Sequence, residues 1–234
     1  MAPFLPTHPY DEIGTKGDGY VGPVTSGIQG SASILHITWM YLQMMGQNGL
    51  REATKIAILN ANYMMRHLES YYKISYLSRR GQLCAHEFVI DISPFNQYGI
   101  TAEDICKRLL DYSFHGPTMS WPVKECLMIE PTESETKEEL DRFIKAMIYI
   151  RSEIEQVIKG KIDYKDSVLY HAPHTVQDLL RKDRLYDMKN AVFPLESLKE
   201  NKFWPTVNRL DNIWGDRNLF CSCDDIETLL AEKQ

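Results

Sequence analysis

The sequence lacks any apolar stretch that approaches the roughly 20 residues needed to cross a bilayer. It also lacks a basic surplus, since 26 Lys+Arg face 32 Asp+Glu and the formal charge is −6. A protein that binds nucleic acid mainly by neutralising phosphates needs such a surplus. The first nine residues show neither a cationic segment followed by an apolar one nor an arginine-rich amphipathic pattern, so we expect no signal or transit peptide. We therefore expect no membrane span and no nucleic-acid partner.

Cysteine is scarce and scattered, with Cys84, Cys106, Cys126, Cys221 and Cys223 in 234 residues. An odd, widely spaced set does not resemble the disulfide framework of a small secreted domain, which favours a reducing compartment. The sequence also contains no Walker loop, no G-x-S-x-G, no H-E-x-x-H and no dinucleotide fingerprint. No single motif therefore names a reaction.

The first 80 residues divide into a loop-rich part and a helical part. Proline and glycine are dense in residues 1–30 and break any helix. A helix capped by Ser31 or Ser33 should follow and end at Gly46 and Gly49, and a second should run from Leu50 to Tyr72. A loop of 30 residues at the front of a domain indicates a functional loop or a segment separated from what it packs against.

The pattern after residue 80 alternates between strands and helices. Residues 87–92 and 126–129 favour strands, and residues 134–159 favour a long helix. Thr101 with Asp104 resembles a capping box that opens another helix. This order predicts an α+β or α/β domain with two layers. The remainder should be loop-like with a short helix near 175–181, and the aromatic anchors should be Phe193, Phe203, Trp204 and Trp214.

Four local features suit binding, and each has a structural alternative. The turn 114–122 carries hydroxyls and an imidazole on a backbone restricted by two prolines, so it is either a binding site or a packed turn. Gly30 and Ser31, before a helix, offer N–H groups to phosphate. Arg209 and Arg217 either hold a carboxylate or pair with Asp211 and Asp216. The segment 130–135 either caps the long helix, which we favour, or supplies acid–base groups.

Two further patterns are weaker indications. His171 and His174 have the spacing of metal ligands on a helix, but Pro173 lies between them, so hydrogen-bonded histidines in a loop are favoured and no metal is expected. Cys221 and Cys223 are too close to bridge each other without strain and are interpreted as free thiols.

Taken together, several stretches resemble one family in order along the chain. The family is the pyridoxal-phosphate-dependent glycine decarboxylase, or P-protein, of the glycine cleavage system, and the resemblance is to its C-terminal part only. The matching stretches are residues 30–35, 39–46, 58–63, 85–91, 111–123, 128–141, 193–195, 200–207 and 215–219. They cover nearly the whole sequence.

The resemblance implies a fold and a division of the chain. The fold would be the C-terminal small domain and linker helices of a fold-type-I, aminotransferase-like enzyme, in the α/β or α+β class. Residues 1–30 would be a loop-rich segment packed on a missing large domain, and 31–80 the linker helices. Residues 81–160 would form the small α/β domain, and 161–234 a C-terminal extension.

The resemblance also implies a function that this chain cannot complete alone. In the family, glycine is decarboxylated and its aminomethyl group passes to the lipoyl arm of the H-protein. The family's Schiff-base lysine lies in a Ser-His-x-Asn-Leu-His-Lys-Thr motif, which this sequence does not contain and which should precede residue 1. We therefore expect no catalytic residue in the chain and no covalently held pyridoxal phosphate. Activity would require the N-terminal part of the P-protein.

The resemblance further implies site residues, partners and a compartment. Gly30 and Ser31 would lie near the cofactor, and His86 and Arg209 near the substrate. The partners would be the N-terminal part of the P-protein, the lipoyl H-protein and further subunits of a homo- or hetero-oligomer. The compartment would be the cytoplasm in a bacterium or the mitochondrial matrix in a eukaryote. The alternatives are a non-catalytic relative that binds the P-protein or the H-protein, a truncated product without a stable function, and a fragment of another fold-type-I amino-acid decarboxylase.

Overall fold

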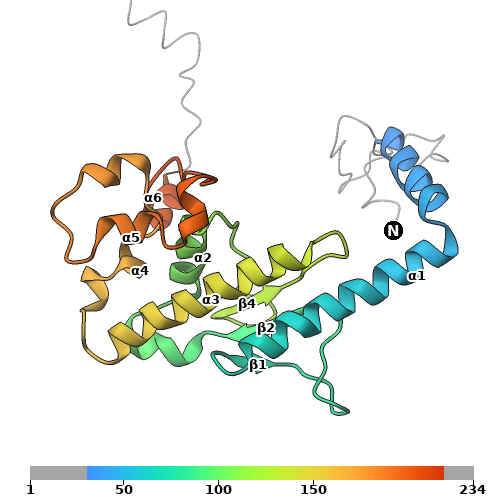
Figure 1. Ribbon diagram of the computed structural model, residues 1–234, viewed down its shortest axis with the longest axis horizontal. Coiled ribbons are helices and arrows are strands. Elements are labelled where there is room, and N and C mark those ends of the chain that lie inside the picture. Colours follow the sequence, from blue (N-terminus) through green and yellow to red (C-terminus); the bar gives the residue numbers. More distant parts are fainter. Residues whose placement is uncertain (1–30, 219–234) are drawn as a thin grey trace, which may run out of the picture. The chain divides into compact units, whose positions relative to one another are not determined.

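The computed structural model describes residues 31–218, which form parts of two compact units. The first unit ends at Lys55 and the second begins at Ile56. The described elements are α1 (Leu35–Leu68), β1 (Lys73–Ser75), β2 (Phe88–Asp91), α2 (Ala102–Asp111), β3 (Thr118–Met119), β4 (Cys126–Ile129), α3 (Lys137–Ile158), α4 (Val168–His171), α5 (Met188–Val192) and α6 (Asn212–Arg217) (Figure 1). Short 3-10 helices lie between several of them. No helix in residues 31–218 is long and apolar enough to cross a membrane.

Helix α1 crosses the boundary between the two units and breaks once. At Gly46 the backbone has φ 59° and ψ −179°, a conformation that favours glycine, so the helix is interrupted there as predicted (Figure 1). Gly49 lies inside the helix rather than at its end, and the helix ends at Leu68 rather than Tyr72. The predicted segment of linker helices, 31–80, therefore also contains strand β1.

The sheet is antiparallel, with strand order β1-β2-β4-β3. Phe88 pairs with Ile129 and Asp91 with Cys126, which fixes the register of the two central strands. The prediction of strand 126–129 is confirmed, and strand 87–92 is one residue shorter at each end. The edge strands β1 and β3 were not predicted, because two or three residues carry no readable alternation. The α+β class is confirmed.

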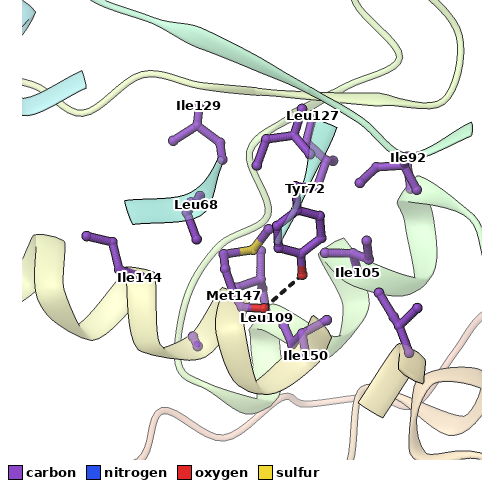
Figure 2. Close-up of a cluster of buried hydrophobic side chains, with 14 of the residues drawn as sticks. Leu68, Tyr72, Ile92, Ile105, Leu109, Leu127, Ile129, Ile144, Met147 and Ile150 are labelled. Atoms are coloured by element: carbon purple, nitrogen blue, oxygen red, sulfur yellow. Dashed lines mark hydrogen bonds between the residues drawn. The ribbon is translucent and has the colours of Figure 1, made fainter. Parts of the chain in front are cut away.

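The core lies between the sheet and three helices of the second unit. The C-terminal part of α1, with α2 and α3, contributes side chains such as Leu68, Leu109 and Met147, which are all fully buried (Figure 2). Tyr72 lies in this core and donates a hydrogen bond of 2.8 Å from its hydroxyl to the Met147 carbonyl. Because that hydroxyl is satisfied, the ring adds apolar contact without leaving a polar group unpaired.

Two helix starts show how local sequence fixes an element. The capping box predicted at Thr101 is confirmed, since its hydroxyl accepts a hydrogen bond from the Asp104 N–H while Asp104 accepts from the Thr101 N–H. Helix α3 begins at Lys137, because Thr136 accepts from the Glu139 N–H at 3.2 Å. The prediction that residues 130–135 cap this helix is therefore wrong.

The C-terminal part of the described chain has little regular structure. The short helix predicted near 175–181 is a 3-10 helix, Val176–Leu180. Phe193 and Trp204 pack edge to face with ring centroids 5.5 Å apart, as anchors should. Phe203 and Trp214 are exposed, so their prediction as anchors is wrong for the described part of the chain.

Candidate functional site

A cavity of about 520 Å³ lies in the second unit where three elements meet. The turn after α2 contributes residues 114–118, and the end of β4 with the residues after it contributes 128–131. Glu135 lies just before α3, and the first turns of α3 contribute Glu139, Leu140 and Phe143. Met64 of α1 completes the lining. The structure therefore brings the turn 114–122, interpreted as either a binding site or a packed turn, together with the acidic segment that precedes the long helix.

The turn that lines this cavity is held tightly in place. A Cβ atom on Gly116 would lie 2.7 Å from the Cβ of Cys106, so only glycine fits this approach of the turn to α2. The imidazole Nδ1 of His115 lies 2.8 Å from the Gly116 carbonyl oxygen. The guanidinium of Arg142 lies 3.6 Å from the ring centroid of Phe114 and donates to the Tyr112 carbonyl at 2.8 Å. These contacts make the cavity wall a preformed surface.

The cavity combines apolar walls with carboxylates. Glu139 is paired with Arg142, whose Nε donates to it at 2.8 Å, and this hydrogen bond lowers the pKa of the Glu139 carboxyl. Glu130 also lines the cavity, and one of its oxygens lies 3.7 Å from the His86 Nε2. His86 itself is half exposed and lies 3.9 Å from Glu87. The arrangement suits a small, partly apolar ligand or side chain that enters from solvent.

Of the four predicted site residues, His86 and Arg209 lie in the second unit, at different cavities, and Ser31 lies in the first unit. Gly30 lies outside the described residues. Ser31 precedes a three-residue 3-10 helix, is exposed and makes no side-chain cap hydrogen bond. His86 lies beside the cavity through Glu130. Arg209 lies elsewhere in the second unit and lines a separate cavity. The roles of these residues toward cofactor and substrate stay predictions.

Arg209 forms an ion pair within the protein, as the structural alternative predicted, but its partners are not the predicted ones. Its guanidinium donates to Asp104 at 2.6 Å and to the carbonyls of Leu169 and Ala172 at 3.1 and 3.2 Å. The predicted pairing with Asp211 or Asp216 is therefore wrong. Asp211 instead accepts from the Trp214 N–H at 2.9 Å and caps α6.

A buried polar network joins α2 and α3 to the C-terminal segment. Arg108, which is only 1% exposed, donates to Asp111 at 2.8 Å, to Glu153 at 2.7 Å and to the Ala191 carbonyl at 2.7 Å. Asp111, which is fully buried, accepts from both the main-chain N–H and the Nδ1 of His174, at 2.7 and 2.8 Å. Each buried charge is thus paired and hydrogen-bonded, as burial demands.

The two histidines are both hydrogen-bonded, as predicted, but His171 is the last residue of helix α4 and not part of a loop. His174 is buried, and its Nε2 lies 2.8 Å from the Tyr186 hydroxyl. His171 accepts at Nε2 from the Arg184 guanidinium at 3.3 Å. Within residues 31–218 no group of three or more histidine, cysteine, aspartate or glutamate side chains is placed to hold a metal ion. Cys84, Cys106 and Cys126 are free, and Cys221 and Cys223 lie outside the described residues.

Three cavities in residues 31–218 offer no lysine for a covalently held pyridoxal phosphate. Such a cofactor needs a lysine amine that faces a cavity. The cavity lined by Gly116, the one lined by Arg209 and a third lined by Arg108 and Tyr186 have no lysine in their linings. Lys202 lies apart from these three cavities, and its Nζ donates to the Asp111 carbonyl at 2.5 Å. We derive no chemical step through the cofactor.

Lys202 nevertheless has an unusual ionisation that can be measured. Burial lowers the pKa of its amine to about 8, against the attraction of Asp111. We expect one dimethyl-lysine ¹³C resonance of the reductively methylated protein to titrate near this value, and the Lys202→Arg variant to lack it. Lys55, which is exposed, serves as the matched control, and Lys55→Arg should leave the resonance in place. If the Lys202 resonance titrates with those of the exposed lysines, the amine is not desolvated.

Fold and cavity together define the class of the protein: an α+β domain with a preformed cavity whose lining contains no lysine. Residues 53–174 match the family model described as "Glycine dehydrogenase, C-terminal domain". The chain therefore belongs to the family of glycine dehydrogenase C-terminal domains.

Similar full-length proteins agree with this assignment. The chain is 50% identical to the glycine dehydrogenase (decarboxylating) of Cereibacter sphaeroides over 97% of its own length and 24% of the relative. It is 51% identical to that of Shewanella woodyi, over 95% of the chain and 23% of the relative. It is also 51% identical to that of a Jannaschia species, over 98% of the chain and 24% of the relative. The chain thus spans about a quarter of the length of the curated relatives it matches.

Sequence reasoning missed the walls of the cavity and the network behind it. Met64, Leu140 and Phe143 have the spacing of ordinary core positions, and no local signal distinguishes a residue that lines a cavity from one that fills a core. Arg108 and Asp111 were not singled out, although a charged pair three residues apart on an apolar helix could have been. No pattern in the sequence singled out Arg184.

Proposed function

We propose that this chain supplies the C-terminal part of a pyridoxal-phosphate-dependent glycine dehydrogenase of the glycine cleavage system. In this role it would act in the decarboxylation of glycine and the transfer of the aminomethyl group to the lipoyl H-protein. The observation that carries the proposal is the 50% identity to glycine dehydrogenases along 97% of the chain. The relatives reported above are all glycine dehydrogenases, which favours this function over another fold-type-I decarboxylase.

The proposal assigns the cofactor and the partners to other parts of the assembly. The amine that anchors pyridoxal phosphate would belong to the other three quarters of the enzyme, because no lysine lines the three cavities described above. The cavity at Gly116 would then be a surface of the substrate or lipoyl channel. The assembly would work in the bacterial cytoplasm or the mitochondrial matrix, where the glycine cleavage system operates.

Complementation tests this function. The purified chain is mixed with a matching N-terminal part of glycine dehydrogenase, pyridoxal phosphate and lipoyl H-protein, and the exchange of labelled bicarbonate into glycine is measured. We expect no exchange from the chain alone and exchange above that of either part from the mixture. Omission of the H-protein is the control and should remove most of the signal. A mixture that forms a stable complex but supports no exchange would contradict a catalytic role and favour a binding role.

A further inference from the structure

A second cavity, of about 370 Å³, has a cationic lining and no part in the proposed function. It is lined by Tyr170, His171, Arg181, Arg184, Asn208, Arg209, Leu210 and Asp211. Three guanidinium groups therefore face it, against one carboxylate. Guanidinium groups recognise carboxylate and phosphate oxygens, so such a ligand would bind to the arginine whose N–H groups are not already hydrogen-bonded to acceptors of the protein.

Two of the three arginines are already occupied. Arg209 spends its Nε and both terminal nitrogens on Asp104 and main-chain carbonyls. Arg181 makes a two-pronged contact with Asp183, with distances of 3.0 and 2.7 Å, and lies 3.7 Å from Asp178. Neither group can turn to a ligand without breaking an ion pair.

Arg184 is different, because within residues 31–218 its only close polar partner is neutral. Its guanidinium donates to the His171 Nε2 at 3.3 Å, and the nearest carboxylate oxygen, on Asp183, lies 4.0 Å away and is already bonded to Arg181. The Arg184 side chain is 21% exposed, so it has lost most of its hydration. A desolvated guanidinium with unspent N–H groups is stabilised by an oxyanion that accepts two of them.

The groups around Arg184 are compatible with a bound anion. Burial and the charge of Arg184 lower the pKa of the His171 imidazole, with smaller contributions from His174 and Arg181, while a hydrogen bond to the Lys165 main chain acts in the opposite direction. The rings of Tyr170 and Tyr186 pack against the imidazole at centroid distances of 5.1 and 6.1 Å. Asp211 accepts from the Trp214 N–H, so its carboxylate is already engaged.

We propose that this cavity binds a small ligand through an oxyanion, a carboxylate or a phosphate, which Arg184 holds in a two-pronged contact beside His171. The anion replaces the weak contact between Arg184 and the imidazole with two charge-assisted hydrogen bonds. The sequence suggested Arg209 as a residue that holds a carboxylate. We assign this role to Arg184, 25 residues earlier, because among the three arginines of the cavity it alone combines partial burial with free donors.

Histidine NMR on the full chain tests the site without any activity assay. The ¹³C-labelled protein is titrated with inorganic phosphate in one arm and with acetate in another, at an ionic strength kept constant with sodium chloride. The His171 resonance is assigned with His171→Gln. We expect a bound anion to offset the charge of Arg184 and raise the pKa of His171 toward its ordinary 6.5. A response to phosphate alone, to acetate alone or to both supports the proposal and identifies the oxyanion.

Three variants separate a site from general charge attraction. Arg184→Gln should weaken binding about tenfold or more and raise the His171 pKa without any anion. Asp183→Asn removes the carboxylate that competes for Arg184 and should tighten binding. Arg79→Gln, a matched loss of charge at an exposed residue outside the cavity, should change neither quantity. The proposal is overturned if neither anion shifts the His171 pKa, or if Arg79→Gln weakens binding as much as Arg184→Gln.

Discussion

Replacement of Asp111 by alanine is expected to lower the free energy of unfolding by about 3–5 kcal/mol, the usual cost of breaking a buried, hydrogen-bonded ion pair. The carboxylate is fully buried and accepts three hydrogen bonds of 2.7–2.8 Å, one from Arg108 and two from His174. Without this carboxylate, the Arg108 guanidinium loses one of its two carboxylate partners, and the buried main-chain N–H of His174 loses its acceptor. The loss should appear as a lower midpoint of urea unfolding measured by circular dichroism.

Asp141→Ala is the matched control for this experiment. Asp141 also has two partners, Lys137 and Tyr63, but its side chain is 40% exposed and water can replace them. We expect this variant to lose much less stability than Asp111→Ala, because exposed ion pairs contribute little. Equal midpoints for the two alanine variants would show that the buried network does not hold the C-terminal segment to α2.

A second substitution at this position, Asp111→Asn, tests how stability depends on the ionisation of Asp111. Burial raises the pKa of this carboxyl, but the hydrogen bonds from His174 and the charge of Arg108 outweigh burial and hold the pKa below its ordinary 3.8. A depressed pKa in the folded state contributes stability above the unfolded value, and this contribution is lost as the pH falls through the folded pKa. The stability difference between wild type and Asp111→Asn should therefore narrow only below pH 3.8.

The second large effect concerns the start of α1, in the first unit. The chain alone should bind an apolar dye strongly, and the dye should be released when the N-terminal part of glycine dehydrogenase is added. Leu35, Ile37, Trp39, Met40, Leu42 and Met44 are all exposed. At 100° per residue these positions fall on two opposite sides of the helix axis, so protein packed against one side would leave the other apolar side in water. These side chains thus form an exposed apolar surface at the start of α1.

A single substitution can test what covers this helix. Trp39→Asp places a charge in the middle of the apolar surface and should weaken complex formation about 30-fold or more, as expected for a buried aromatic anchor worth about 2 kcal/mol. The dissociation constant is measured by fluorescence anisotropy with the labelled N-terminal part. Leu185→Asp adds the same charge to another exposed apolar residue, in the second unit, and should leave the affinity unchanged. If Trp39→Asp binds as tightly as wild type, the remainder of the enzyme does not cover this helix.

Several elements were predictable because their causes lie within a few residues. The capping box of Thr101 and Asp104 depends on contacts three residues apart, and the apolar run at 126–129 is continuous, so both are confirmed. Gly46 was recognised as a break because a residue without a side chain adopts its backbone conformation at little cost. The α+β class followed from the order of these elements. The turn 114–122 was interpreted as either a binding site or a packed turn, and its residues 114–118 line a cavity.

The rest could not be predicted because it depends on pairs that are distant in the chain. Gly49 was expected to end a helix, but the helix continues past it, since a glycine permits a break and does not require one. Arg209 was expected to pair with Asp211 or Asp216, which are its sequence neighbours. Its partner is Asp104, 105 residues away, which no periodicity indicates. The division of the chain into four segments stays a prediction.

The sequence by itself determined the family, the α+β class and the helices and strands whose hydrogen bonds close within a few residues. Only the tertiary structure decided how charge is distributed inside the domain: Arg108 and Arg209 are occupied by buried carboxylates, whereas Arg184 is left with a neutral imidazole. The physical reason is that an arginine is committed by whichever acceptor reaches it in the folded chain. That acceptor is chosen by packing between distant segments, not by the residues beside it.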